Sequence, residues 1–388
     1  MSKNSIINSK PESKSFFDKP YFADNLDSGT NTPLLEKIVS LELDDNLSQE
    51  DIEIFNKILK GCNDLLKKKV NSHEFKINKY EFFELKFIEK KDIARYLIYR
   101  YKYRHFSKKN KIGKFPPCLQ IEPTSVCNYR CVMCYQADKS FSNKSEGFMS
   151  NMSLDLYKKI IDQVEGKIES ITLASRGEPT LNKEFVNMLN YSSNKFLALK
   201  MNTNASLLNE KLIHSILSTD IQSIVFSVDA ADKETYEKIR VNGKFEKIMK
   251  NLNLFAKIRK EHYSKEKHIV KISGVKISDT QSLSEMEQKF KDIADVIAFV
   301  PYTEWESAYD NEENDLKHAC QELWTRMFVW ADGKVNPCDY DYKSTLSKWN
   351  VKNKTISEIW NSKEYDSLRQ KHLDQKRNTI EPCIRCQN

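Results

Sequence analysis

The sequence lacks long apolar runs and is poor in glycine. No segment has about 18 or more consecutive apolar residues, and the N-terminal residues lack the apolar core of a secretory signal. We therefore expect no membrane span and a cytoplasmic protein. Glycine contributes only 9 of 388 residues, whereas charged residues contribute 30%. This composition is typical of a soluble, helix-rich protein.

The charges are mixed rather than gathered into blocks. The net charge is +7, and lysines and glutamates are interleaved along the chain. Such a pattern permits an acidic partner but does not require nucleic acid, so we expect no stable nucleic-acid complex. Nine cysteines in a cytoplasmic chain indicate metal or cluster ligands rather than disulfides.

The N-terminal part of the chain divides into two segments. Residues 1–31 are polar with little periodicity, which predicts a disordered or loosely docked arm. Residues 32–115 carry helical patterns and are predicted to form a helical extension. One stretch of it, rich in tyrosine and basic residues, admits a nucleic-acid or membrane-surface face. We favour a helix that packs Ile93, Leu97 and Ile98 against the next domain.

Residues 116–303 alternate between strand-like and helical patterns six times. The strand-like runs are 119–122, 170–175, 196–203, 223–229, 269–276 and 296–302. Ser153 and Asn209 are candidate N-caps of intervening helices, and Ser282–Glu285 fits a capping box. This alternation predicts an α/β fold with a parallel sheet and right-handed crossovers. Six units indicate a partial (β/α)6 barrel, with an open doubly wound sheet as the alternative.

Polar or turn-forming residues follow each of the six strand-like runs. They are Glu122, Ser175–Pro179, Asn202–Asn204, Ser227–Asp229, Ser273–Lys276 and Pro301–Tyr302. Each alone is an ordinary start of a loop. The carboxyl ends of parallel strands, however, meet at one rim, where binding sites assemble. We therefore predict a functional site at this rim.

Three cysteines follow the first predicted strand at the same rim. Cys127, Cys131 and Cys134 are separated by three and then two residues. Three thiolates on one tight loop suit a metal centre that keeps one coordination position open.

The C-terminal part, residues 304–388, has a different character. Asp332-Gly333 between two alternating runs predicts a β-hairpin, and residues 356–373 predict one amphipathic helix. We expect a small α+β module. It contains four cysteines, Cys320, Cys338, Cys383 and Cys386. Four thiolates suit zinc or an iron–sulfur cluster, and their spacing alone does not distinguish the two.

These motifs together resemble the radical S-adenosylmethionine (SAM) superfamily. The three-cysteine loop matches its signature, with Met133 at a position where many relatives carry an aromatic residue. Gly177-Glu178-Pro179 and Ser227-Val228-Asp229 strengthen the resemblance. The four-cysteine tail resembles an auxiliary SPASM domain in its shortened, one-cluster Twitch form. The resemblance extends over residues 118–388.

The resemblance implies SAM and two [4Fe–4S] clusters as cofactors. Cys127, Cys131 and Cys134 would ligate the SAM-binding cluster, and the four C-terminal cysteines the auxiliary one. The implied cofactor contacts are Met133, Tyr135, Gly177, Glu178, Pro179, Asn202, Asn204, Ser227, Asp229 and Arg240. A flavodoxin- or ferredoxin-type reductant would supply the electron.

The resemblance also implies a reaction. In the tail, 17 residues lie between Cys320 and Cys338, and 44 lie between Cys338 and Cys383. This spacing is similar to that of Twitch-type alcohol dehydrogenases of aminoglycoside biosynthesis. We therefore predict a radical SAM oxidoreductase of carbohydrate biosynthesis. It would oxidise or epimerise a carbinol of a sugar, cyclitol, nucleotide sugar or other small polar metabolite, with the auxiliary cluster accepting an electron. The predicted substrate or base residues are Lys276, Arg176 and Tyr302.

Two other functions remain open. A radical SAM peptide maturase would use the N-terminal extension to bind a leader peptide, but its helical pattern and the few tail cysteines count against this. A non-catalytic zinc or iron–sulfur electron-transfer protein is disfavoured, because it would make no use of the polar residues at the rim.

Overall fold

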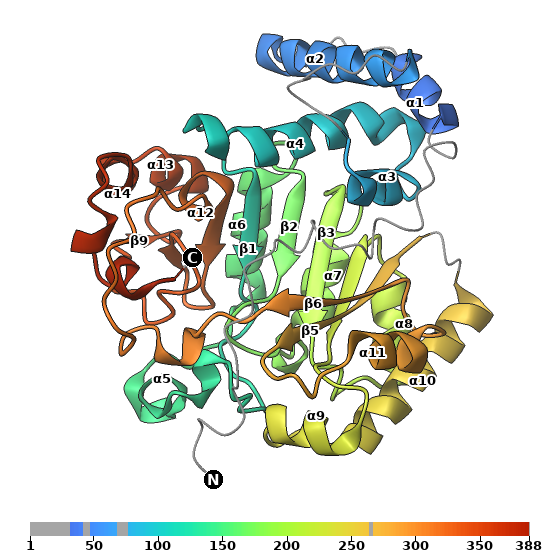
Figure 1. Cartoon of the computed structure of the whole chain (residues 1–388), viewed down its shortest axis with the longest axis vertical. Helices are drawn as coiled ribbons and strands as arrows, with labels where there is room; N and C mark the ends of the chain where they lie inside the picture. Colours follow the sequence, from blue (N-terminus) through green and yellow to red (C-terminus); the bar gives the residue numbers. More distant parts are fainter. Residues whose placement is uncertain (1–31, 42–46, 68–76, 264–266, 388) are drawn as a thin grey trace.

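The computed structural model describes residues 32–41, 47–67, 77–263 and 267–387. At its centre, the six predicted strand-like runs form a parallel sheet (Figure 1). The strands are β1 Cys118–Ile121, β2 Ser170–Leu173, β3 Ala198–Thr203, β4 Ser223–Ser227, β5 Ile269–Lys276 and β6 Val296–Pro301. They lie in the order β6-β5-β4-β3-β2-β1. Because this order never reverses, successive crossovers stay on one face, as in a barrel. The predicted partial barrel is confirmed.

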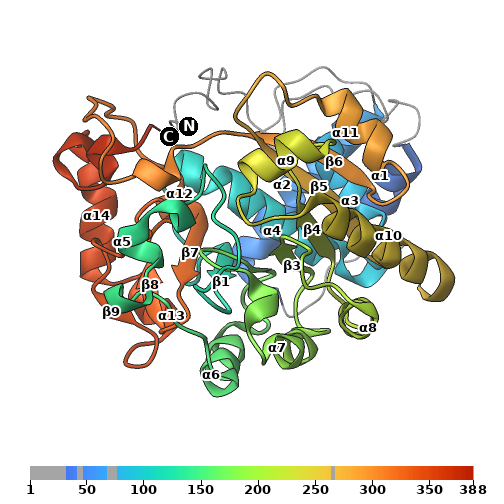
Figure 2. The same cartoon turned by 90° about the horizontal axis from the view of Figure 1, so that it is seen from below.

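Helices cover the outer face of this sheet (Figures 1 and 2). They are α6 Leu154–Val164, α7 Phe185–Ser192, α8 Glu210–Leu217, α9 Lys233–Ile239, α10 Phe245–His262 and α11 Leu283–Phe290. The predicted N-caps are confirmed, because Ser153, Asn209 and Ser282 each accept a backbone N–H at the start of a helix. Of the capping box predicted at Ser282–Glu285, the structure shows the Ser282 side-chain bond alone. The helices and the sheet share one large apolar core, which leaves the inner face and the strand ends to polar side chains.

Four helices of the described residues precede the barrel, and the last two of them lie across the N-terminal ends of its strands (Figure 1). They are α1 Thr32–Val39, α2 Gln49–Leu66, α3 Lys79–Leu85 and α4 Ile93–His105. Ile93, Leu97 and Ile98 are buried, as predicted. Arg100 of the same helix is also buried, 3.1 Å from Glu81 in an ion pair. The tyrosine-rich stretch therefore faces inward, and the predicted arm at residues 1–31 lies outside the described residues.

The longest helices, α2 and α10, have 18 residues each. Both carry several charged side chains among their apolar ones. None of the helices in the described ranges is long and apolar enough to span a bilayer.

The C-terminal module continues the barrel sheet. Strand β7 Arg326–Val329 pairs in parallel with β1, and β8 Lys334–Asn336 and β9 Trp349–Asn350 add antiparallel strands, giving one nine-stranded sheet. The predicted hairpin joins β7 to β8, and Gly333 takes a φ of +86°, a backbone conformation that favours glycine. Two short helices complete the framework, α12 Glu322–Thr325 in this module and α5 Lys139–Ser142 beside it.

The prediction of one helix over residues 356–373 is wrong. The segment forms two helices, α13 Ile356–Trp360 and α14 Lys363–Leu373. Ser362 accepts the N–H of Tyr365 and so begins a new helix inside the apolar pattern. Trp360 and Tyr365 are both buried on either side of the break, which shows that packing sustains it.

Candidate active site

The cysteine loop after β1 lies against a cavity inside the barrel. Cys127, Cys131 and Cys134 all line this cavity. The loop is held by the N–H of Val132, which donates to the carbonyl of Ile239 at 3.1 Å. Burial and the neighbouring thiol of Cys131 raise the pKa of Cys127 to about 12, and they raise the pKa of Cys134 as well. Such thiols ionise only beside compensating positive charge, which iron ions provide.

The spacing of possible ligands bears on the kind of metal centre. Among the described residues, no group of three or more His, Cys, Asp or Glu side chains is arranged to hold a single metal ion. A cluster of four irons holds its thiolates farther apart than one tetrahedral zinc ion does. Three thiols around a shared cavity fit an iron–sulfur cluster that keeps one position open.

Gly177 brings the end of β2 against the cysteine loop. A Cβ at this position would lie 2.2 Å from the carbonyl oxygen of Thr124 and 2.6 Å from that of Val126. Only glycine permits this approach of two backbones. The next residue, Glu178, donates its N–H to the same Val126 carbonyl at 2.9 Å. The glycine predicted from the sequence therefore positions the loop that carries the cysteines.

Glu178 is buried and already has several partners. Its carboxylate accepts hydrogen bonds from the Thr203 hydroxyl at 2.6 Å, the Asn204 N–H at 2.7 Å and the Thr180 hydroxyl at 2.6 Å. These bonds join the end of β2 to the end of β3. Pro179 begins a short 3₁₀ turn and does not line the cavity. The predicted contact of Glu178 with SAM stays a prediction.

Asp229 and Arg240 form a buried ion pair next to Cys131 of the cysteine loop. Asp229 accepts the N–H of Val275 at 2.7 Å and also binds the guanidinium of Arg240. One guanidinium nitrogen of Arg240 lies 3.7 Å from the sulfur of Cys131. Arg240 lines the cavity and Asp229 does not. The structure thus places the carboxylate behind the arginine that it orients.

The cavity has a volume of about 600 Å³. Eight of the ten predicted cofactor contacts line it, namely Met133, Tyr135, Gly177, Glu178, Asn202, Asn204, Ser227 and Arg240. The side-chain oxygen of Asn202 is buried and has no hydrogen-bond partner among the described residues. A buried acceptor of this kind calls for a donor from a ligand. The hydroxyl and amino groups of SAM would satisfy it.

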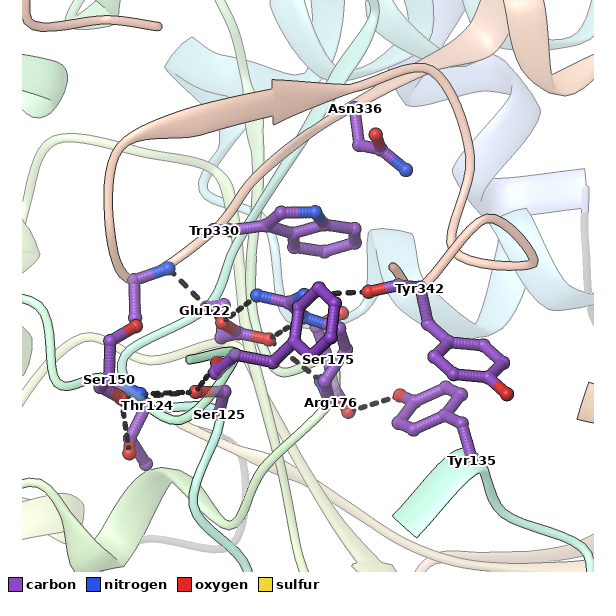
Figure 3. A network of polar contacts seen from close by, with 12 residues as sticks. Glu122, Thr124, Ser125, Tyr135, Ser150, Ser175, Arg176, Trp330, Asn336 and Tyr342 are labelled. Atoms are coloured by element: carbon purple, nitrogen blue, oxygen red, sulfur yellow. Dashed lines mark hydrogen bonds and ion pairs between the residues drawn. The ribbon is translucent and has the colours of Figure 1, made fainter. Parts of the chain in front are cut away.

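The three predicted substrate residues do not come together. Arg176 lines the cavity, but its guanidinium donates to Glu122 twice at 2.7 Å and to the carbonyl of Tyr342 at 2.7 Å (Figure 3). Lys276 and Tyr302 do not line the cavity. Successive side chains of a strand point to opposite faces. Lys276 lies an odd number of positions after the β5 residues that face inward, so its side chain points away from the cavity.

Other residues at the cavity were missed in the sequence. They are Tyr80, Tyr103, Lys200, Lys271, Trp305, Arg326 and Asp339. A signal existed for Lys200, because it precedes Asn202 by two positions and so shares its face of β3. Nothing in the local sequence shows that Tyr80 and Tyr103, from α3 and α4, reach the barrel interior.

The four C-terminal cysteines form a second group. The neighbouring thiols Cys383 and Cys320 add to burial in raising the pKa of Cys338, and Cys320 likewise helps raise the pKa of Cys383 to about 12. Cys386 is close enough to influence Cys383 in the same way. Four thiols are sufficient to ligate one [4Fe–4S] cluster completely.

Two family models match the chain in the regions just described. A model of the radical SAM superfamily matches residues 121–284, and a model of an iron–sulfur cluster-binding domain, SPASM, matches residues 320–387. The chain belongs to the radical SAM superfamily. Radical SAM proteins of this type bind SAM and a [4Fe–4S] cluster, and the SPASM domain carries auxiliary iron–sulfur chemistry, as predicted.

The matches to curated relatives cover only part of each protein. The chain is 32% identical to the tungsten-containing aldehyde ferredoxin oxidoreductase cofactor-modifying protein of Pyrococcus furiosus, over 29% of this chain and 30% of that protein. It is 28% identical to the mycofactocin maturase MftC of Mycobacterium tuberculosis, over 36% of this chain and 34% of that protein. The matches therefore span about a third of the length of these relatives.

A solved structure extends the likeness of the fold. Streptococcus suis SuiB bound to the precursor peptide SuiA covers 82% of this chain and 80% of its own, with 16% identity and a TM-score of 0.53. At this identity the likeness concerns the fold alone. The relatives do not support the predicted oxidation of a sugar or cyclitol. The Twitch form and the oxidoreductase class stay predictions.

Proposed function

We propose that this chain is a radical enzyme that uses SAM to modify a peptide. The observation that carries the proposal is the placement of three cysteine thiols on a cavity that continues into the barrel. A reactive group formed at this loop would meet its substrate inside the protein, away from bulk water. The similarity to a maturase and to a fold crystallised with a precursor peptide supports a peptide as the substrate.

The residues present have separate tasks under this proposal. Cys127, Cys131 and Cys134 would hold the cluster, and its open iron would bind SAM. When bound and reduced, the cluster and SAM together would supply radical chemistry for hydrogen-atom abstraction from the substrate. Arg240, which Asp229 orients, would face the carboxylate of SAM.

The C-terminal cluster completes the electron balance. Its four cysteines would ligate every iron of one [4Fe–4S] cluster, which would leave no vacant iron for a substrate and would supply electron transfer. Loss of a hydrogen atom to the deoxyadenosyl radical, of a proton to a base and of an electron to this cluster would leave the substrate oxidised by two electrons. The reductant of the first cluster would be a flavodoxin or ferredoxin.

The helical N-terminal extension limits how a leader peptide would bind. Within the described residues, α1 to α4 contain no strand that offers its edge to an extended peptide. We propose that the barrel opening or a helix face recognises the peptide instead.

The test begins with the anaerobically reconstituted full chain. About eight iron and eight sulfide per chain, with SAM cleaved on reduction, would support a radical enzyme with two clusters. Bound zinc without SAM cleavage would overturn it and favour the non-catalytic alternative. Cys127→Ala serves as the control and should abolish cleavage.

The substrate class requires a second measurement. The reduced enzyme is incubated with deuterated peptides encoded beside its gene and, separately, with deuterated cyclitols and nucleotide sugars. Deuterium in 5′-deoxyadenosine, together with a modified peptide mass, would support the peptide proposal. Transfer from a cyclitol or sugar but from no peptide would overturn it in favour of the small-metabolite alternative.

A further inference from the structure

Besides Arg176 and Arg240, three further cationic side chains line the same cavity. They are Lys200 on β3, Lys271 on β5 and Arg326 on β7. In Figure 1 the helices α3 and α4 lie across the N-terminal ends of the strands. Tyr80 from α3 and Tyr103 from α4 also line the cavity. Positive charges confined together in a protein interior repel one another and require compensation.

Two of the three cations have compensation from the protein. The amine of Lys271 lies 3.6 Å from the carboxylate of Glu84. Arg326 lies 3.5 Å from the carboxylate of Glu322 and donates to the side chain of Gln120 at 3.2 Å. Its charge also interacts with that of Asp339.

Lys200 has no such partner. No ion pair or hydrogen bond joins its amine to any residue in the described ranges. Burial, followed by the charges of Lys271 and Arg326, lowers the pKa of Lys200 to about 8. The amine is nevertheless still largely protonated at pH 7. The charge of Glu84 acts on Lys200 more weakly than burial and the two cations do. A protonated amine that faces a cavity without an ion pair to the protein can bind an anion there.

We propose that Lys200 binds a carboxylate of the substrate inside the barrel. The proposal rests on the proposed function and specifies its substrate class. In a peptide, the carboxylate is an acidic side chain or the C-terminal group. Lys200 lies two positions before Asn202 on β3, which corresponds to roughly 7 Å along the strand. An anion held there would place the neighbouring substrate carbons toward the cysteine loop.

The experiment measures binding to the reconstituted, SAM-loaded full chain by calorimetry at pH 7. The probes are a capped tripeptide with a central glutamate, the same peptide with glutamine, an N-acetylated tripeptide with a free C-terminal carboxylate, and inorganic phosphate. The proposal expects at least one carboxylate peptide to bind about tenfold or more tighter than the glutamine peptide. Which peptide prefers the site distinguishes an acidic side chain from a chain terminus.

Variants assign the preference to Lys200. Lys200→Gln should abolish the tenfold preference, and Lys200→Arg should restore part of it. Lys183→Gln removes an exposed lysine of the barrel and should leave the preference unchanged. Equal affinity of the native protein for charged and neutral peptides, or a preference that survives in Lys200→Gln, would overturn the proposal. Tight binding of phosphate but of neither carboxylate peptide would also overturn it.

This result is separable from the proposed function. SAM cleavage by the reduced protein is measured on the same preparation. If SAM is cleaved and the carboxylate preference is absent, only the anion site is wrong. If SAM is not cleaved but the preference is present and depends on Lys200, the radical function is wrong and the anion site stands.

Discussion

Arg176 donates two hydrogen bonds of 2.7 Å to the carboxylate of Glu122, from two different guanidinium nitrogens. The third nitrogen donates to the carbonyl of Tyr342 in the C-terminal module, and the guanidinium lies 4.2 Å from the ring centre of Trp330 (Figure 3). Glu122 in turn accepts the N–H of Ala331 at 3.1 Å. A single buried ion pair thus ties the radical SAM barrel to the SPASM domain.

Replacing Arg176 by alanine should destabilise the protein strongly. Both side chains of the pair are almost completely buried, so the substitution leaves the carboxylate of Glu122 without its cation. Breaking a buried pair in this way costs about 3–5 kcal/mol. The free energy of unfolding of the full chain, followed by circular dichroism in urea, measures the effect.

Arg95 provides a matched control. It also binds a carboxylate through two nitrogens, that of Glu169, but 41% of its side chain is exposed. Arg95→Ala should therefore cost about 1 kcal/mol or less. If Arg176→Ala is no more harmful than Arg95→Ala, the bridging role is wrong. If Arg176→Lys keeps full stability but loses turnover, Arg176 acts on the substrate instead.

Gly177→Ala should damage the SAM-binding cluster. The added methyl group would meet two backbone carbonyls at 2.2 and 2.6 Å, so the cysteine loop has to move. We expect iron content near that of the auxiliary cluster alone and SAM cleavage lowered by about tenfold or more. Gly113→Ala is the control, since its Cβ would have no neighbour closer than 3.6 Å. Full iron content and normal cleavage in Gly177→Ala would contradict the prediction.

The two groups of cysteines should separate by their effect on SAM. Cys127→Ala should abolish SAM cleavage, because the cluster that binds SAM loses a ligand. Cys338→Ala should retain some cleavage without forming product, because only the electron acceptor is lost. The rates of 5′-deoxyadenosine and product formation are measured separately for each variant. Normal product formation by Cys338→Ala would show that the auxiliary cluster is not the electron acceptor.

The charge of Lys200 should lower stability at neutral pH. Its pKa falls from 10.5 to about 8 on folding, through burial and the charges of Lys271 and Arg326, opposed by weaker effects of Cys118 and Glu84. Below pH 8 the amine is charged in both states and its burial is unfavourable. Between pH 8 and 10.5 the unfolded chain binds the extra proton, so the contribution of Lys200 to stability improves as the pH rises.

Lys200→Met should therefore stabilise the protein at pH 7, by about 1–3 kcal/mol. The gain should shrink as the pH approaches 10. Thermal unfolding of the ligand-free chain from pH 7 to 10 measures it, with Lys183→Met as the exposed control. A gain that does not change with pH would show that the charge of Lys200 is not its cause.

Much of the barrel was accessible from local patterns. Each strand-like run lies within two or three residues of an observed strand, because buried parallel strands are short apolar runs between capped helices. The one helix that was predicted across residue 362 failed there, since a serine N-cap inside an amphipathic pattern is invisible to periodicity. The pairing of β7 with β1 joins residues that are more than 200 positions apart, and no local signal reports it.

The site was only partly predictable for the same reason. Residues that hold a cluster are recognisable by type and spacing, as with Cys127 and its two partners. The roles of charged side chains are not, because they depend on which partner lies opposite. Arg176 is paired with Glu122, while no ion pair or hydrogen bond joins the Lys200 amine to another described residue.

The sequence by itself determined the chemistry that this protein can perform. Three closely spaced cysteines, a glycine at a strand end and four further cysteines specify clusters through covalent spacing and ligand type, which are local properties. Tertiary structure alone decided which of the cations at the cavity form ion pairs and which one, Lys200, does not, because electrostatic pairing depends on distances between strands that folding brings together. The cysteines determine how a radical would be made, and Lys200 is the proposed site that selects its substrate.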